Sequence, residues 1–311
     1  MEKLPFRIVH YGANDPETTR GGVETFARRL RLMFDEVTFM TPRTLDVARV
    51  RREGLRVICD NQHVLDWPED MPVVGFQHGV AAVKLRAAPN FGRWRLARRQ
   101  ARAARRPNTV WVANSHWVGE KFGRLHGNDA AHVIHYPVDV ERFDARLDNE
   151  GSNLVLHDAR EKHKGSRLIP RLAAAFPEWR FEPLDCHPDA VADRMRKARM
   201  FVHLSRYEGN SVVCNEAMAM NLPCFFTDVG LFRDADRPSE VYLVDADLAY
   251  SSRAGLEREF RSFISSLGAR AYRPRGWILD HATPQIARAG WRSVIEQLDI
   301  MRSAGGEGRA L

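Results

Sequence analysis

The sequence predicts an α/β protein that is built on parallel sheets and divided into two domains. Short apolar segments that end in polar loops alternate with helical patterns along the chain, which is the element order of a parallel α/β sheet. The length of 311 residues favours two domains, each large enough for its own core. The polar run 144–152 is the best candidate for a linker between them.

Composition and charge limit the classes of function that the protein can have. A hydrophobic share of 44% and a charged share of 28% are typical of a soluble globular protein. The net charge of +7 favours acidic partners such as nucleotide phosphates, anionic lipid or nucleic acid. No secretory signal and no run of ~20 apolar residues occurs, so we expect a cytoplasmic protein, with peripheral contact at the inner membrane face as its closest approach to a bilayer. Four cysteines show no metal-ligand spacing and are interpreted as buried thiols in a reducing compartment: Cys59, Cys186, Cys214 and Cys224.

The first half of the chain contains six expected strands, at 6–10, 37–40, 55–59, 72–77, 109–113 and 131–135. After the first strand, Gly21 and Gly22 open a helix whose apolar residues recur at spacings of three and four. Glycines at a helix start let a ligand approach the backbone closely, although they also serve any loop.

Polar residues follow several of these strands. His78 stands at the carboxyl end of strand 72–77, before a glycine, which is where α/β sheets place ligands. The chain contains twelve histidines, and most of them must have no role in a functional site, which weighs against assigning one to His78. For His63, after the preceding strand, the functional and the ordinary interpretation have equal weight. Ser115 follows strand 109–113 and precedes a helix.

Residues 93–106 contain seven arginines in fourteen residues and predict a helix with a basic face. Trp94 and the alanines fall on another face, so the simplest interpretation is a solvated helix that docks on its sheet. A patch for an acidic acceptor or anionic lipid is the second interpretation. Contact with nucleic-acid phosphates is the third.

The second half begins with an expected strand at 153–157, followed by a charged loop that ends in Lys164 and Gly165. Further strands are expected at 179–182, 200–204, 223–227 and 240–244, with helices at 188–198, 256–266 and 284–301. We therefore expect domains at 1–145 and 146–285. Residues 286–311 would form a final helix, with the option of crossing back to the first domain, and a mobile tail from 302.

The most informative stretch is 204–230. Its helix, 212–220, is apolar almost all round and yet contains Glu216, whose burial is costly unless charged or hydroxylic groups meet it. Glu208 stands in the preceding loop, and Ser211 is the expected N-cap, so that N–H groups of the first turn would favour an anion. Two carboxylates around an anion-binding helix start suit a nucleotide sugar. The alternative is a buried helix whose glutamate pairs with an arginine of the same protein.

This stretch, SRYEGNSVVCNEAMAMNLPCFFTDVG, resembles the Glu-x7-Glu segment of retaining glycosyltransferases of family 4. The resemblance implies the GT-B fold, in which two Rossmann-like domains with parallel sheets face each other across a deep cleft. It implies that Glu216 holds the nucleotide ribose and that Glu208 contacts the donor sugar. The diphosphate would lie near the backbone of Gly209, Asn210, Ser211 and Val212. The family more often has an aromatic residue and a glycine where this chain has Asn210 and Ser211.

The same resemblance extends to other loops. It implies that Lys164 holds the diphosphate and that Gly21 and Gly22 approach the donor or acceptor. The family arginine that shares the diphosphate is absent, because Asp158 occupies its usual position; Arg160, two residues later, is the candidate to replace it. His78 would lie near the transferred sugar, and Ser115 would face the cleft.

We therefore expect a retaining hexosyl- or pentosyltransferase that acts without a metal ion or organic cofactor and uses a nucleoside-diphosphate sugar. No Asp-x-Asp pair stands where it would bind a metal. The acceptor would be a glycan, a lipid-linked sugar or another polyanion. A sugar-nucleotide epimerase of the same architecture is one alternative. A nucleic-acid-binding protein, or a DNA-modifying glycosyltransferase, that uses helix 93–106 is the other.

Overall fold

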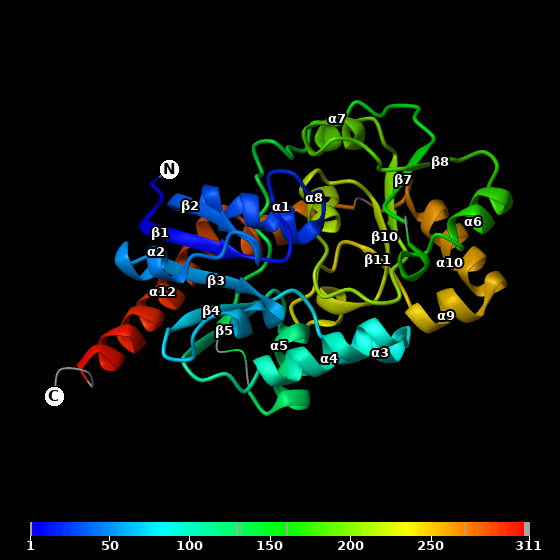
Figure 1. Ribbon diagram of the computed structural model, residues 1–311. Coiled ribbons are helices and arrows are strands. Elements are labelled where there is room, and N and C mark those ends of the chain that lie inside the picture. The colour runs from blue at the N-terminus through cyan, green and yellow to red at the C-terminus, as the bar shows by residue number, and fades with distance from the viewer. Residues whose placement is uncertain (1, 129, 131, 160, 271, 308–311) are drawn as a thin grey trace. The chain divides into compact units, whose positions relative to one another are not determined.

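A computed structural model describes residues 2–128, 130, 132–159, 161–270 and 272–307 of the chain (Figure 1). The chain divides into two compact units. The first consists of Met1–Pro137 together with Pro284–Leu311, and the second is Val138–Thr283.

The first unit is built on a parallel sheet of six strands in the order β2-β1-β3-β4-β5-β6. All six expected strands are present, although the last is only two residues long. The strands are β1 (Leu4–Tyr11), β2 (Phe34–Met40), β3 (Arg56–Asp60), β4 (Val73–Gln77), β5 (Thr109–Ala113) and β6 (His132–Val133).

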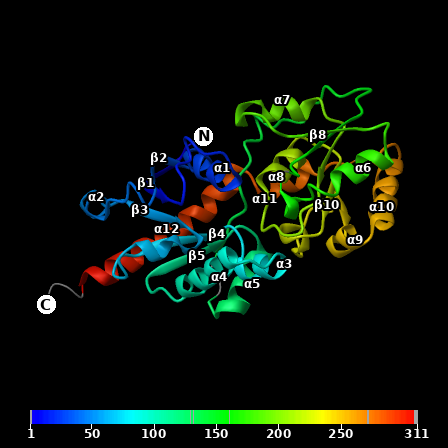
Figure 2. The same ribbon diagram turned by 45° about the vertical axis from the view of Figure 1, so that its right-hand side comes forward.

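Helices from both ends of the chain cover this sheet. They are α1 (Gly22–Arg29), α2 (Val47–Arg52), α3 (Ala81–Ala87), α4 (Phe91–Ala103), α5 (His116–His126) and α12 (Pro284–Glu307), with 3₁₀ turns at Leu30–Leu32 and Asn61–Asp66. The last helix, red in Figure 2, packs against β4, β5 and β6. Its Trp291 is fully buried and contacts the rings of Phe26, Phe34 and Phe76. The C-terminal helix therefore completes the core of the first unit.

The second unit is built on a parallel sheet of five strands in the order β11-β10-β9-β7-β8. Its strands are β7 (Leu154–His157), β8 (Arg180–Pro183), β9 (Met200–His203), β10 (Cys224–Thr227) and β11 (Tyr242–Val244). Its helices are α6 (Ile169–Ala175), α7 (Val191–Arg196), α8 (Val212–Ala219), α9 (Ala246–Ser251), α10 (Arg253–Ser266) and α11 (Arg275–His281), with 3₁₀ turns at Lys162–Lys164, Pro188–Ala190 and Gly230–Arg233. The two parallel Rossmann-like sheets confirm the predicted fold class.

In the second unit, successive strand residues pack into two separate hydrophobic cores, one on each face of the sheet. Leu156, Phe201 and Phe226 pack with α7, α8 and α11 on one face of the sheet. Val202 and Phe225, which neighbour two of them in sequence, pack with α6, α9 and α10 on the other face (Figures 1 and 2). Because both faces are covered, the strands are apolar at successive positions, as expected for a buried parallel sheet.

Two expectations about chain organisation and one about cysteine burial were wrong. The polar run 144–152 is not a linker: Asn149 and Ser152 donate side-chain hydrogen bonds to the carbonyls of Ala198 and Lys197, which hold the run inside the second unit. The residues beyond 301 do not form a tail at once, because α12 continues to Glu307 and Arg302 donates to the Gly54 carbonyl. Cys186 is partly exposed, whereas Cys59, Cys214 and Cys224 are buried as expected.

Numbered within each unit, both sheets have the strand order 2-1-3-4-5 from the edge inward. In such sheets the chain leaves the first strand on one side and the third on the other, so a crevice opens at their carboxyl ends. The residues after β1 and β3, and those after β7 and β9, are therefore the first places to look for a ligand site.

Candidate functional site

The loop and helix after β9 have the geometry of an anion-binding helix start. The Ser211 hydroxyl accepts a hydrogen bond from the N–H of Cys214 at 3.4 Å, which confirms the predicted N-cap. The first N–H groups of α8, those of Val212 and Val213, have no acceptor within the helix. One turn further on, Glu216 is only 6% exposed. The helix thus presents amide donors at its start and a buried carboxylate beside them.

The loop 204–211 is held in place through its backbone carbonyls, which accept hydrogen bonds from residues outside the loop. The Thr227 hydroxyl donates to the Ser205 carbonyl at 2.6 Å, and the Leu231 N–H donates to the Gly209 carbonyl at 2.8 Å. Gly230 has a φ of +57°, and a Cβ there would lie 2.3 Å from the carbonyl oxygens of Glu208 and Gly209. Only glycine therefore permits this close approach, which sets the position of Glu208.

Four charged side chains meet at the carboxyl ends of β7 and β9. The ammonium of Lys164 lies 3.3 Å from the Asp158 carboxylate and 3.7 Å from that of Glu208. The other Asp158 oxygen lies 2.6 Å from Nδ1 of His203, the last residue of β9. The Nε2 of His203 lies 3.9 Å from Glu208. We call Asp158, Lys164, His203 and Glu208 the charged cluster; the sequence predicted Lys164 and Glu208 here but missed His203.

The charges of the cluster follow from its contacts. Burial disfavours the charged form of Asp158, but His203 and Lys164 outweigh it and hold the pKa of Asp158 below its usual range. Burial also opposes a charge on His203, yet the Asp158 carboxylate raises the pKa of His203 well above its ordinary value of 6.5. Against burial, Glu208 and Asp158 raise the pKa of Lys164. At neutral pH His203 is therefore protonated and offsets the charge of Asp158.

This arrangement explains how the chain accommodates an acid at position 158. A second cation, His203, lies on the neighbouring strand and pairs with it. Arg160, the predicted substitute for the missing arginine, lies outside the described residues.

The carboxyl ends of the first and third strands of the first unit also hold a buried carboxylate, here at the end of the third strand. Asp60, the last residue of β3, accepts from Nε2 of His10 at 3.0 Å and from Nε2 of His78 at 2.6 Å. Burial opposes the charge, but the two imidazoles outweigh it and hold the pKa of Asp60 low. Nδ1 of His78 lies 2.5 Å from the Tyr136 hydroxyl. His78 is thus held at both ring nitrogens, by Asp60 at Nε2 and by Tyr136 at Nδ1.

The remaining predicted residues lie at helix starts of the first unit. Gly21 is the N-cap of α1 and Gly22 its first residue. Ser115 is fully buried and caps α5, accepting from the Val118 N–H at 3.2 Å. His63 is buried, and its Nδ1 lies 3.0 Å from Asp66.

The arginine-rich helix α4 differs from its predicted packing. Arg106, just beyond its end, is buried and donates to the carbonyls of Pro68 and Met71, so one of the seven arginines is structural. Trp94 does not dock with the alanines but is 44% exposed. Among the helices that the structure describes, none is both long and apolar enough to cross a membrane.

The raised pKa of His203 predicts a pH-dependent contribution to stability. Because the folded protein binds this proton more tightly than the unfolded chain, the contribution is complete below pH 6.5 and is lost as the pH rises towards the raised pKa. The stability difference between the wild type and His203→Gln should therefore shrink by up to about 1.4 kcal/mol per pH unit above that point. Urea unfolding at several pH values between 6 and 9 measures it.

The Asp158→Asn background is the control for this experiment, since Asp158 is the group that raises the pKa of His203. When both proteins carry Asp158→Asn, the stability difference caused by His203→Gln should depend less on pH. An equal difference at pH 6 and pH 9 in the wild-type background would contradict the charged state assigned to His203.

Comparisons with known proteins bear on the same segment. Residues 167–252 match the model of the family described as glycosyl transferases group 1. A search of curated protein sequences finds no match. Sucrose-phosphate synthase from Thermosynechococcus elongatus is similar in structure, with 14% identity, a TM-score of 0.72, and coverage of 94% of this chain and 99% of that one.

Two further structures are similar over nearly their whole length. Anabaena HepE, solved with UDP and glucose, has 14% identity and a TM-score of 0.69, and covers 94% of this chain and 100% of its own. The catalytic domain of starch synthase IV from Arabidopsis thaliana, bound to ADP and acarbose, has 9% identity and a TM-score of 0.59, with 97% and 99% covered. Residues 167–252, within the second unit, therefore match a glycosyl transferases group 1 domain, and the two Rossmann-like sheets have the fold of these structures, the GT-B fold.

Proposed function

We propose that the protein is a retaining glycosyltransferase that moves a sugar from a nucleoside-diphosphate donor to an acceptor hydroxyl. The observation that carries this proposal is the family match over 167–252, because it contains both Glu208 and Glu216. The charged cluster and the start of α8 supply the chemistry that such a donor needs.

The donor would bind along the carboxyl ends of β7 and β9. The carboxylate of Glu216, buried in α8, suits a pair of hydroxyls, since each of its oxygens accepts a hydrogen bond. The diphosphate would lie at the start of α8, where the backbone around Gly209, Asn210, Ser211 and Val212 offers N–H groups and the positive end of the helix dipole. The base, ribose and phosphates would thus follow one path from Glu216 towards Lys164.

Charge balance explains the role of Lys164. Because protonated His203 offsets Asp158, the carboxylate that chiefly balances Lys164 is Glu208, 3.7 Å away, and a phosphate would compete with it for the ammonium. Its side chain is 29% exposed, so the ammonium can exchange a carboxylate for a ligand oxygen. Glu208 would then accept a hydroxyl of the donor sugar. Arg160, whose structure is not described, would add a second cation to the diphosphate.

Catalysis would depend on stabilising the departing nucleoside diphosphate. Lys164 and the amides of α8 place positive charge where negative charge develops, and such preorganised charge is the largest contribution in many enzymes. With these groups in place, the proposed reaction requires neither a metal ion nor an organic cofactor. The acceptor hydroxyl would attack from the face that the phosphate leaves, which retains the configuration. His78, fixed by Asp60 and Tyr136, would orient the sugar.

The charge of the chain indicates the class of acceptor. The net charge of +7 favours a polyanionic glycan or a lipid-linked sugar with a phosphate. Gly21, Gly22 and Ser115, all at helix starts of the first unit, would lie on the acceptor side.

Replacing Lys164 tests the proposed diphosphate contact. Lys164→Ala should weaken nucleoside-diphosphate binding roughly 10- to 150-fold, the loss expected for one hydrogen bond to a charged group. Lys162→Ala is the matched control, because Lys162 is an exposed lysine two residues away in the same turn. Titration calorimetry gives both constants. Equal losses in the two variants would mean that only the general charge matters.

A panel of uridine, guanosine and adenosine diphosphate sugars tests the reaction itself. One class should raise the melting temperature at concentrations above its dissociation constant. Incubation of that donor with an acceptor should release the nucleoside diphosphate and form a glycoside with unchanged anomeric configuration. Formation of an epimer from the donor alone would identify an isomerase instead, and stabilisation by none of the donors would contradict nucleotide-sugar binding.

A further inference from the structure

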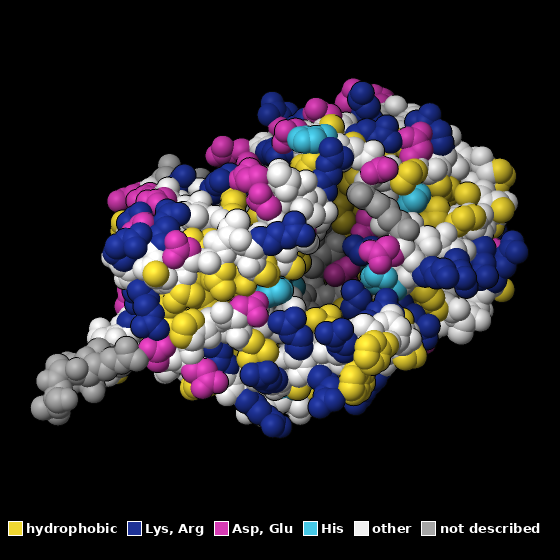
Figure 3. All heavy atoms as spheres, in the orientation of Figure 1, with side chains coloured by type: hydrophobic (Ala, Val, Ile, Leu, Met, Phe, Trp, Pro, Cys, Tyr) yellow, Lys and Arg dark blue, Asp and Glu magenta, His cyan; other side chains and the backbone are white. Residues whose placement is uncertain are grey.

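Residues 81–106, which form α3 and α4, carry nine lysines and arginines and no acidic residue. Apart from the buried Arg106, these cations lie at partly or fully exposed positions. Figure 3 shows hydrophobic side chains bordered by lysine and arginine over this part of the first unit. A segment of this composition attracts anions along its whole length.

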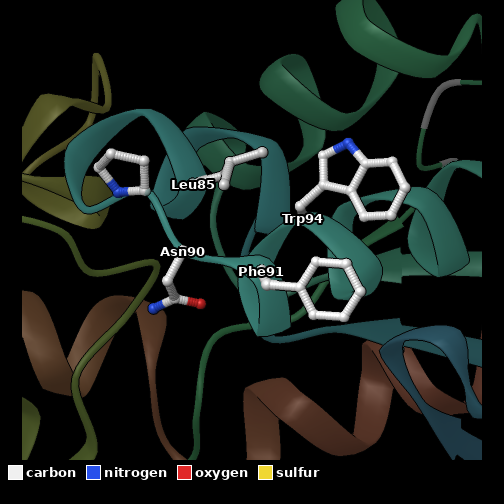
Figure 4. Close-up of a pocket in the computed structure, with 5 residues that line it drawn as sticks. Leu85, Asn90, Phe91 and Trp94 are labelled. Atoms are coloured by element: carbon white, nitrogen blue, oxygen red, sulfur yellow. The ribbon is translucent and has the colours of Figure 1, made fainter.

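Apolar side chains line a hollow between the two helices. Its volume is about 550 Å³, and it is lined by Leu85, Pro89, Asn90, Phe91 and Trp94 (Figure 4). Phe91 is 71% exposed and Trp94 is 44% exposed, although both are among the most hydrophobic side chains. Two exposed aromatic rings beside an apolar hollow indicate an interaction surface.

The rings are arranged as an apolar wedge and not as an open stacking platform. Phe91 stacks on Trp94 with ring centroids 5.7 Å apart and an angle of 22° between the planes. The guanidinium of Arg98 lies over the Trp94 ring, 4.8 Å from its centroid. Since Phe91 precedes Trp94 by three residues and Arg98 follows it by four, the indole is flanked on the two sides along the helix. Trp94 therefore has Phe91 on one side and Arg98 on the other, which leaves little of its ring face for a nucleic-acid base to stack on.

We propose that this surface docks on an anionic lipid bilayer. We call it the aromatic–basic surface, defined by Leu85, Pro89, Phe91 and Trp94 with the surrounding exposed arginines Arg86, Arg95, Arg98 and Arg102. Tryptophan and phenylalanine partition into the boundary between headgroups and acyl chains. The arginines lie at the height of the lipid phosphates and pair with them. Apolar wedge and cationic rim together match this partner better than they match a protein surface or a single nucleic-acid strand.

This inference is independent of the donor site, because every residue in it lies between Leu85 and Arg102 of the first unit. A protein without transferase activity could still dock in this way, so the two proposals can fail separately.

Vesicle co-sedimentation of the full chain tests the proposal. The probes are phosphatidylcholine vesicles with and without about one-third phosphatidylglycerol. The wild type should bind the anionic vesicles and bind neutral ones much more weakly. The double variant Phe91→Ser, Trp94→Ser should lower the partition coefficient on anionic vesicles at least about tenfold at unchanged net charge. The triple variant Arg86→Gln, Arg95→Gln, Arg102→Gln should lower it roughly 100-fold.

Each variant has a matched control. Ile300 and Leu279 are exposed to the same extents as Phe91 and Trp94, 71% and 44%, so Ile300→Ser, Leu279→Ser removes equal apolar exposure elsewhere. Arg171→Gln, Arg258→Gln, Arg292→Gln removes three exposed charges elsewhere. Each control variant should bind anionic vesicles more tightly than the variant of the aromatic–basic surface to which it is matched. The proposal is overturned if the aromatic variant binds anionic vesicles as tightly as the wild type does. It is also overturned if the protein binds single-stranded DNA through these aromatic residues and does not bind vesicles.

Discussion

The buried ion pair between Asp158 and His203 is the interaction on which the site of the second unit depends. Asp158 follows the first strand of the sheet and His203 ends the third, so the pair lies where these two neighbouring strands end and their connections leave on opposite faces of the sheet. An unpaired carboxylate in this position would be strongly destabilising, because burial removes its hydration. With the proton on His203, the pair is neutral, so Lys164 is shared between Glu208 and a ligand, and the dipole of α8 acts on the same ligand.

A related solution occurs in the first unit with the roles of the strands exchanged. There the carboxylate, Asp60, ends the third strand, and the histidine, His10, lies on the first. His78, from the fourth strand's end, adds a second imidazole to the same oxygen. Both sheets thus place a buried acid at their switch point and stabilise it with histidine. In the first unit this fixes the orientation of His78, whereas in the second it sets the local charge.

Much of the fold was predictable because its signals are local. Apolar runs of four to six residues predicted all the strands of both sheets, and Ser211 was recognisable as an N-cap from the polar residue before an apolar helix. The run 144–152 was wrongly predicted to be a linker, because a linker and a packed loop have the same polar composition. Trp94 misled as well, since its apolar side chain suggested burial where the structure exposes it.

The chemistry of the site was predictable only in part. Lys164 and Glu208 stand in recognisable loops, and the structure brings them within 3.7 Å of each other. His203 could not be singled out among twelve histidines, because its importance comes from Asp158, 45 residues away in sequence. The same holds for Tyr136, which meets His78 across 58 residues. Partners brought together by strand pairing leave no local pattern in the chain.

The central claim, that a nucleoside diphosphate binds at the charged cluster and the start of α8, is tested most directly by hydrogen–deuterium exchange. Adding the nucleoside diphosphate that stabilises the protein best should slow exchange in two separate segments, 158–165 and 205–216. Slower exchange confined to other segments, or unchanged exchange at saturating ligand, would contradict it.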